Sequence, residues 1–194
     1  MIIFFVFAFL LLPTIHCSSD DHSPLAKNFT RNLYAAIIND ARHEYSIGLQ
    51  IANMQEIRYD IELEQEAKTF LKCEDIKHTS NYRVFFLEKR LQTQFLSEPD
   101  ARLIMRNKTK LLENEDFKKN AEFLHPLQAG VGCVDLLSKC PFPGKQLLNE
   151  AGVVCLFGPK NTDPISEFKY GKPRSQCANG KADSGLCRRP FTYN

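Results

Sequence analysis

The six cysteines that follow the apolar start of the chain are the residues with the clearest chemistry. They are Cys73, Cys133, Cys140, Cys155, Cys177 and Cys187. An even set of cysteines is typical of disulfide bonds in an oxidising compartment, and none of the gaps has the Cys-x-x-Cys spacing of a zinc site. The spacing alone leaves their connectivity open, because many pairings of six cysteines exist.

Catalytic patterns are missing from the sequence. It contains no His-Glu-x-x-His and no Gly-x-Ser-x-Gly, and its serines and histidines follow no triad order. The cysteines are accounted for by disulfides, so no nucleophile with a nearby base is indicated. We therefore predict no enzyme activity, no catalytic residue and no cofactor.

Two acceptor sequences for N-linked glycans occur, at Asn28 (Asn-Phe-Thr) and at Asn107 (Asn-Lys-Thr). In a secreted eukaryotic chain they predict exposed, glycosylated positions, although a three-residue match also arises by chance.

The N-terminus has the pattern of a secretory signal peptide. Ile2–Leu12 is a run of eleven apolar residues that ends at Pro13, which is too short to span a bilayer. We predict removal of residues 1–17, with a buried strand, a signal anchor and a lipoprotein acylated at Cys17 as the alternatives. The charge of 25 basic against 23 acidic residues is too balanced to indicate a nucleic-acid or acidic-lipid partner. The chain is therefore expected outside the cell, without a membrane span.

The elements that position these residues follow from periodicity. Apolar residues at helical spacing predict a helix over 30–46, and a second helical pattern covers 60–78, with Asp60 as its N-cap and its helix over 60–73. Two runs bounded by glycine and proline, 130–137 and 152–157, predict antiparallel strands.

Other segments are less regular. Val84–Leu87 fits a strand or a buried helical segment, and 100–112 looks helical. Residues 18–29 are expected as a loose leader and 158–194 as an extended tail tied by its own disulfide. Helices first and strands later indicate the α+β class. The residues expected on buried faces are Leu33, Ile37, Leu63, Ala67, Phe70, Val131, Val134, Val153 and Leu156.

Eight stretches of the sequence carry a family resemblance through their shared order along the chain: Asn39–Arg42, Ala52–Ala67, Cys73–His78, Gln128–Cys133, Val154–Pro159, Tyr170–Pro173, Ser175–Cys177 and Gly185–Cys187. Together they resemble the CAP superfamily, also called the SCP domain. That superfamily includes cysteine-rich secretory proteins, venom antigen 5, plant pathogenesis-related proteins and the worm venom-allergen-like proteins. The resemblance covers about residues 30–187, and Tyr59 stands where the family usually has tryptophan.

The resemblance implies an α-β-α sandwich with a short cysteine-tied C-terminal tail. It divides the chain into a signal peptide (1–17), a CAP-like domain (18–165) and a hinge-like tail (166–194). It also implies the disulfides Cys73–Cys140, Cys133–Cys155 and Cys177–Cys187. Arg174 and Ala182 stand where hinge cysteines are common, so a further pair is missing as a whole.

The family commonly has a cavity with two histidines and two glutamates. Only His78 has a counterpart in this sequence, which makes it the one candidate metal ligand, and a plain surface or helix-end histidine is the competing interpretation. Lys119 stands where the second histidine is expected, ahead of Asn120-Ala-Glu122. An ammonium group repels a divalent ion, so we expect no metal site here.

The resemblance implies a secreted, non-enzymatic protein that binds a lipid, a sterol or a protein partner. The alternatives are a secreted hydrolase and a protease-inhibitor or toxin-like module. In the latter, the loop between Cys177 and Cys187 would be the active part, whereas structural capping of the domain by that loop is the simpler interpretation.

Overall fold

A computed structural model of the chain describes residues 24–70, 72–87, 108–113, 117–118, 121–141, 150–159 and 162–190. The predicted signal peptide over 1–17, Asn107 and Lys119 lie outside these residues.

The longest element is helix α1, which spans Pro24–Gly48. It begins six residues before the predicted helix and takes in part of the expected loose leader, which corrects that expectation. Proline suits the first helical position, because its missing N–H would have no partner there. Asn28 lies within this helix.

Helix α2 spans Ile61–Ala67. The predicted N-cap is confirmed, since the Asp60 carboxylate accepts hydrogen bonds from the backbone N–H groups of Glu62 and Leu63. The helix is shorter than the predicted 60–73, and Cys73 belongs to a separate 3₁₀ turn, η1 (Cys73–Asp75). Three further short elements lie among the described residues: α5 (Lys108–Glu113), η2 (Ala121–Leu124) and η3 (Ile165–Glu167).

Four strands form one sheet in the order β1-β3-β4-β2. They are β1 (Arg58–Tyr59), β2 (Arg83–Leu87), β3 (Gly130–Pro141) and β4 (Glu150–Gly158). The two late strands pair antiparallel as predicted, and the segment 84–87 is a strand rather than a buried helix. The sheet is mixed instead of purely antiparallel, because β1 pairs parallel with β3 at its edge.

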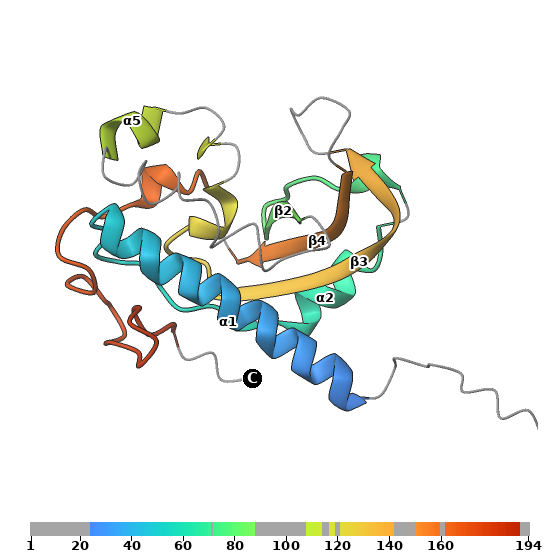
Figure 1. Cartoon of the computed structure of the whole chain (residues 1–194), viewed down its shortest axis with the longest axis horizontal. Helices are drawn as coiled ribbons and strands as arrows, with labels where there is room; N and C mark the ends of the chain where they lie inside the picture. The colour runs from blue at the N-terminus through green and yellow to red at the C-terminus, as the bar shows by residue number, and fades with distance from the viewer. Residues whose placement is uncertain are drawn as a thin grey trace, which may run out of the picture.

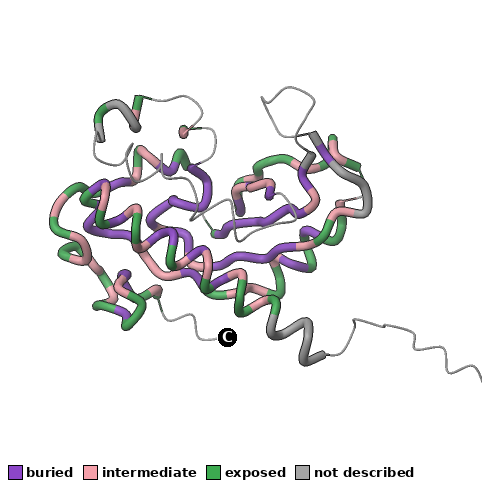
Figure 2. The backbone as a smooth tube through the Cα atoms, in the orientation of Figure 1, coloured by how far each residue is buried: buried purple, intermediate pink, exposed green. Residues whose placement is uncertain are grey.

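The two faces of the sheet pack against different helices (Figure 1). On one face Val131, Val153 and Phe157 join Ile38 of α1 in the larger buried cluster. On the other face the alternate residues of the strands pack with Ala67 of α2. Strand side chains point alternately to the two faces, so adjacent residues such as 153 and 154 serve different clusters. Figure 2 shows the buried stretches running along these strands.

Leu33 does not lie in the core, contrary to the prediction. Its exposed fraction is 40%, whereas Ala35, Ile38 and Ala41 are buried. These three residues follow the helical repeat, and around the helix axis Leu33 lies roughly 80° beyond Ala41 and farther still from the other two. Ile37 is half-buried beside them.

Gly132 allows α2 to lie directly on β3. A Cβ atom at this position would be 2.2 Å from the backbone nitrogen of Glu64. Only glycine therefore fits where the helix crosses the strand.

The C-terminal segment is more closely packed than the predicted extended tail. Phe168, Leu186 and Cys187 are buried, and the first two belong to the larger core cluster. In Figure 1 this segment, in red, lies beside the C-terminal half of α1, where the Nδ1 atom of His43 is 3.2 Å from the Gly185 carbonyl oxygen. No described helix is long and apolar enough to cross a membrane.

Candidate functional site

His78 lies beside a buried carboxylate that an arginine already holds. The Nε2 atom of His78 is 3.9 Å from Oε1 of Glu122, whose side chain is 8% exposed. Arg83 binds the same carboxylate with two hydrogen bonds, from Nε at 2.6 Å and from Nη2 at 2.5 Å. The loop before β2 supplies His78, β2 supplies Arg83 and η2 supplies Glu122, so three segments meet here.

The electrostatics of this cluster oppose cation binding. Burial lowers the pKa of His78, Glu122 raises it and Arg83 lowers it, with a net shift below the ordinary value of 6.5. The Nδ1 atom of His78 accepts a hydrogen bond from the Val84 backbone N–H at 3.0 Å. The hydrogen bond with Glu122 raises the pKa of Arg83, so this guanidinium stays charged.

These residues do not fit the divalent metal site of the CAP family. The guanidinium of Arg83 occupies both carboxylate oxygens that a metal would need. Within the described part of the chain, no group of three or more histidine, cysteine, aspartate or glutamate side chains is arranged to hold a metal ion. The sequence patterns did not identify Arg83 as part of this cluster. The only signal for it is that an arginine directly precedes the apolar run Val84–Leu87.

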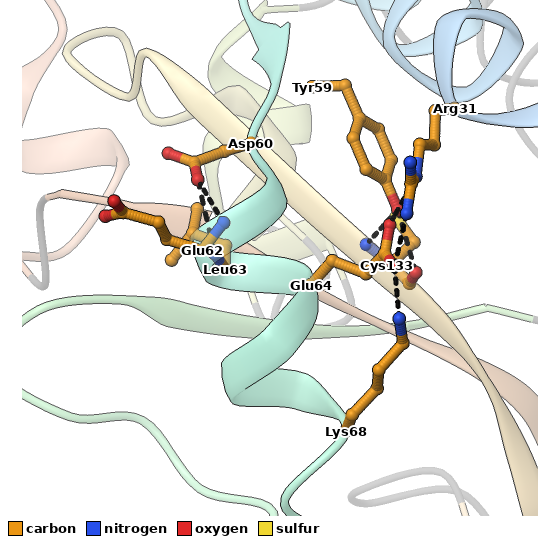
Figure 3. A network of polar contacts seen from close by, with 8 residues as sticks. All are labelled: Arg31, Tyr59, Asp60, Glu62, Leu63, Glu64, Lys68 and Cys133. Carbon is orange, nitrogen blue, oxygen red and sulfur yellow. Dashed lines mark hydrogen bonds and ion pairs between the residues drawn. The ribbon is translucent and has the colours of Figure 1, made fainter. Parts of the chain in front are cut away.

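A second buried glutamate connects α1, β1 and α2 (Figure 3). Glu64, with a side chain 5% exposed, accepts hydrogen bonds from Arg31 at 2.6 and 2.8 Å and from Lys68 at 2.5 Å. The Tyr59 hydroxyl is 2.8 Å from Glu64 Oε2 and 2.9 Å from the Cys133 carbonyl oxygen. Burial alone would raise the pKa of Glu64, but the hydrogen bonds from its three partners outweigh it and lower the pKa to about 2.

Two polar residues of α1 hold the segment that precedes β1. The Asn39 amide pairs with both backbone groups of Ile57 at 2.8 Å. Arg42 is fully buried and donates to the carbonyl oxygens of Gln55 and Phe123, and burial lowers its pKa to about 9. The Asn-x-x-Arg motif of the first helix therefore has a structural role, because both side chains satisfy backbone groups that the core would otherwise leave unpaired.

His125 is another buried titratable residue that the sequence analysis did not single out. Its Nδ1 atom accepts from the Leu127 N–H at 3.2 Å, and its Nε2 atom lies 2.9 Å from the Thr162 hydroxyl. This arrangement fits a neutral imidazole. Burial, followed by repulsion from Arg42, lowers the pKa of His125 to about 4.

The cysteines lie together in the pairs that the resemblance implies. Sulfur atoms are 2.11 Å apart in Cys73–Cys140, 2.04 Å in Cys133–Cys155 and 1.94 Å in Cys177–Cys187. Cys133 and Cys155 are direct partners in the β3–β4 register. Their oxidation stays a prediction.

The loop between Cys177 and Cys187 is bound to the domain by backbone hydrogen bonds. The Cys187 N–H donates to the Met54 carbonyl, and the Glu56 N–H donates to the Cys187 carbonyl, both at 2.8 Å. Arg174 Nη2 donates to the Ala182 carbonyl at 3.2 Å, so the two positions where hinge cysteines are common are neighbours here. These contacts favour the capping interpretation over a free inhibitory loop.

No family model and no curated protein matches this sequence. Among solved structures, the crystal structure of hookworm platelet inhibitor matches with a TM-score of 0.50 and 16% identity, over 86% of this chain and 93% of that one. The crystal structure of Na-ASP-1 matches with a TM-score of 0.45 and 14% identity, over 93% of this chain. The present chain spans about 50% of the length of Na-ASP-1.

The likeness to the hookworm protein concerns the fold, and it agrees with the order of motifs in the sequence. The chain therefore has a fold similar to that of hookworm platelet inhibitor.

Proposed function

We propose that this chain is a secreted, non-enzymatic CAP protein that acts by binding a protein partner outside the cell. In this proposal residues 1–17 are removed on export, the three cysteine pairs are oxidised, and Asn28 and Asn107 carry glycans. The mature chain is then an α-β-α sandwich with a cysteine-tied tail.

The observation that carries the proposal is the double hydrogen bond between Arg83 and Glu122. A general base or a metal ligand needs a carboxylate that is available to substrate or metal. Here the carboxylate beside His78 is bound by a guanidinium on both oxygens. We therefore assign the cluster of His78, Arg83 and Glu122 a structural role, and we assign the binding of a partner to the exposed surface of the domain.

A protein partner is favoured over a lipid by the outer face of α1. Leu33 and Ile47 are 40% and 46% exposed, and the exposed acidic residues Asp40 and Glu44 lie between them in the sequence. Apolar side chains mixed with charges are typical of protein interfaces, whereas a lipid needs an enclosed apolar pocket. The hookworm protein of similar fold is named a platelet inhibitor, and an action on cells is compatible with this proposal.

The test is binding of the labelled, purified chain to intact cells before and after protease treatment of their surface. We expect saturable binding that protease treatment removes and that a charge reversal on α1, Asp40→Lys, weakens. Lys77→Ala, on the loop before β2, is the matched control. Equal binding to protein-free vesicles of phosphatidylcholine and cholesterol would instead indicate a lipid ligand. Hydrolysis of a substrate panel that is lost in His78→Ala would overturn the non-enzymatic proposal.

A further inference from the structure

The basic residues of the chain are concentrated near its C-terminus, in residues 169–190, which we call the basic segment. It holds six of the 25 lysines and arginines but only one of the 23 acidic residues, Asp183. Residues 191–194, which follow, contain no charged side chain. The six cations are Lys169, Lys172, Arg174, Lys181, Arg188 and Arg189. The formal net charge of +2 for the whole chain thus hides one strongly positive segment on an otherwise acidic chain.

Most of this positive charge lies at the surface. Four of the six cations are exposed: Lys169, Lys172, Lys181 and Arg188. None of these four forms an ion pair with a carboxylate in the part of the chain that the structure describes. Glu56 borders the segment through its backbone bond to Cys187, and its carboxylate lies 3.9 Å from Arg58 instead. Figure 2 shows most of the segment exposed or half-buried, so its charge is available to a partner.

Backbone hydrogen bonds place the four exposed cations in two groups along one stretch of the domain. The Lys169 carbonyl oxygen accepts from the Ala52 N–H at 2.7 Å, so the first two cations lie near this residue. The Cys187 N–H donates to the Met54 carbonyl at 2.8 Å, and Lys181 pairs with Cys187 in an antiparallel bridge. The last two cations therefore lie further along the same stretch. Their backbones are fixed before any ligand arrives, which reduces the entropy cost of binding.

We infer that the basic segment binds a sulfated polysaccharide, a linear chain that repeats its sulfate groups. Cations distributed along a stretch suit a ligand with repeated negative charge, whereas a single anion would need them around one point. A lysine ammonium acts as a point charge that can approach a sulfate from many directions, and each neutralised group releases counterions. Nucleic acid is also a linear polyanion, and the choice of a polysaccharide rests on the extracellular location in the proposed function.

The test is isothermal titration of the purified full chain with a heparin oligosaccharide of defined length, at several sodium chloride concentrations. We expect saturable binding whose logarithmic affinity falls linearly with the logarithm of the salt concentration. Lys172→Ala/Lys181→Ala removes one cation from each group. It should weaken binding about tenfold, as expected for two exposed charge contacts, and should reduce the salt slope by about two. Both side chains are exposed, so the folded domain should keep its amide NMR spectrum.

Lys72→Ala/Lys77→Ala is the matched control, because it removes two exposed lysines from the segment before β2. Asp40→Lys, which tests the protein partner, should not weaken heparin binding, so the two proposals can fail separately. Chemically desulfated heparin should bind far more weakly than heparin. Absence of heparin binding, an equal loss in the two double variants, or tighter binding to a DNA oligonucleotide of equal charge would overturn the inference.

Discussion

Glu64 and Glu122 are buried glutamates of similar exposure, and each accepts two hydrogen bonds from an arginine, yet their surroundings differ. Glu64 also receives Lys68 and lies next to the Tyr59 hydroxyl, so both of its oxygens have more than one partner. Glu122 has an exposed histidine, His78, as its next titratable neighbour. The Glu64 carboxylate is therefore fully surrounded by hydrogen-bond donors, whereas the Glu122 carboxylate keeps a titratable histidine beside it.

The comparison also shows which side responds to mild acid. His78 and His125 have lowered pKa values, and both lie on or next to the segment that carries Glu122. The Glu64 carboxylate, with a pKa of about 2, stays ionised far below neutral pH. We therefore expect the Glu122 side to loosen first as the pH falls.

The largest effect on this comparison is expected from Gly132→Ala. The added methyl carbon would be 2.2 Å from the Glu64 backbone nitrogen, so α2 would have to move off β3 and the Glu64 network would separate. We expect a loss of about 3 kcal/mol or more in the free energy of unfolding, measured by urea denaturation. Gly180→Ala is the control, because no atom lies within 4 Å of that site and only its φ of +82° opposes a side chain. An equal loss in the two variants would contradict the close approach of α2 to β3.

The next effect is the pH dependence of stability. The pKa of His125 falls from 6.5 in the unfolded chain to about 4 in the folded one, so the unfolded state binds more protons between these values. Stability should then drop as the pH falls from 6.5 to 4, by about 3 kcal/mol at 1.36 kcal/mol per pKa unit, and should level off below pH 4 for this group. Urea denaturation across this range checks it.

His125→Gln is the matched variant for the pH series, since its amide can replace both hydrogen bonds without titrating. It should flatten the slope between pH 4 and 6.5. An unchanged slope would show that His125 does not control the response to acid.

Replacing Glu64 or Glu122 by glutamine should lower the free energy of unfolding by smaller and unequal amounts, measured by urea denaturation. Glu64→Gln leaves Arg31 and Lys68 without their anion and should cost about 2 kcal/mol, because both cations are partly exposed and can be hydrated. Glu122→Gln should cost about 1 kcal/mol, since it strands one arginine. Glu62→Gln, on the exposed face of α2, is the control and should change stability by about 0.5 kcal/mol or less. A larger loss of stability in Glu122→Gln than in Glu64→Gln would contradict the conclusion that the Glu64 network contributes more to stability.

The smallest effect is expected at His78 itself. Arg83→Ala removes a cation that lowers the pKa of His78 and frees the Glu122 carboxylate that raises it. The pKa of His78, followed by NMR, should therefore rise. The double variant Arg83→Ala/Glu122→Gln should cancel most of that rise, and a rise of the same size in both would exclude Glu122 as its cause.

Periodicity was enough to predict the elements whose pattern is local. The Asp60 cap and the strands at 130 and 152 depend on neighbouring residues. The end of α2 and the start of α1 were placed wrongly, because helix ends depend on packing as much as on sequence. The packing of the tail was missed since its few apolar residues, such as Phe168 and Leu186, follow no repeat.

The polar clusters could not be predicted for a different reason. Arg31 and Glu64 are 33 residues apart, and Arg83 and Glu122 are 39 apart, so no spacing rule connects them. The resemblance singled out His78 alone. In the structure its neighbours Glu122 and Arg83 form an ion pair, which leaves no free carboxylate beside the imidazole.

Arg83 binds both oxygens of the Glu122 carboxylate, and we therefore predict that His78 and Glu122 do not bind a divalent metal ion. Isothermal titration of the purified chain with zinc at neutral pH tests it directly, with His78→Ala as the paired variant. We predict that neither protein binds zinc stoichiometrically in the micromolar range. One zinc per chain at micromolar affinity, abolished by His78→Ala, would contradict this account.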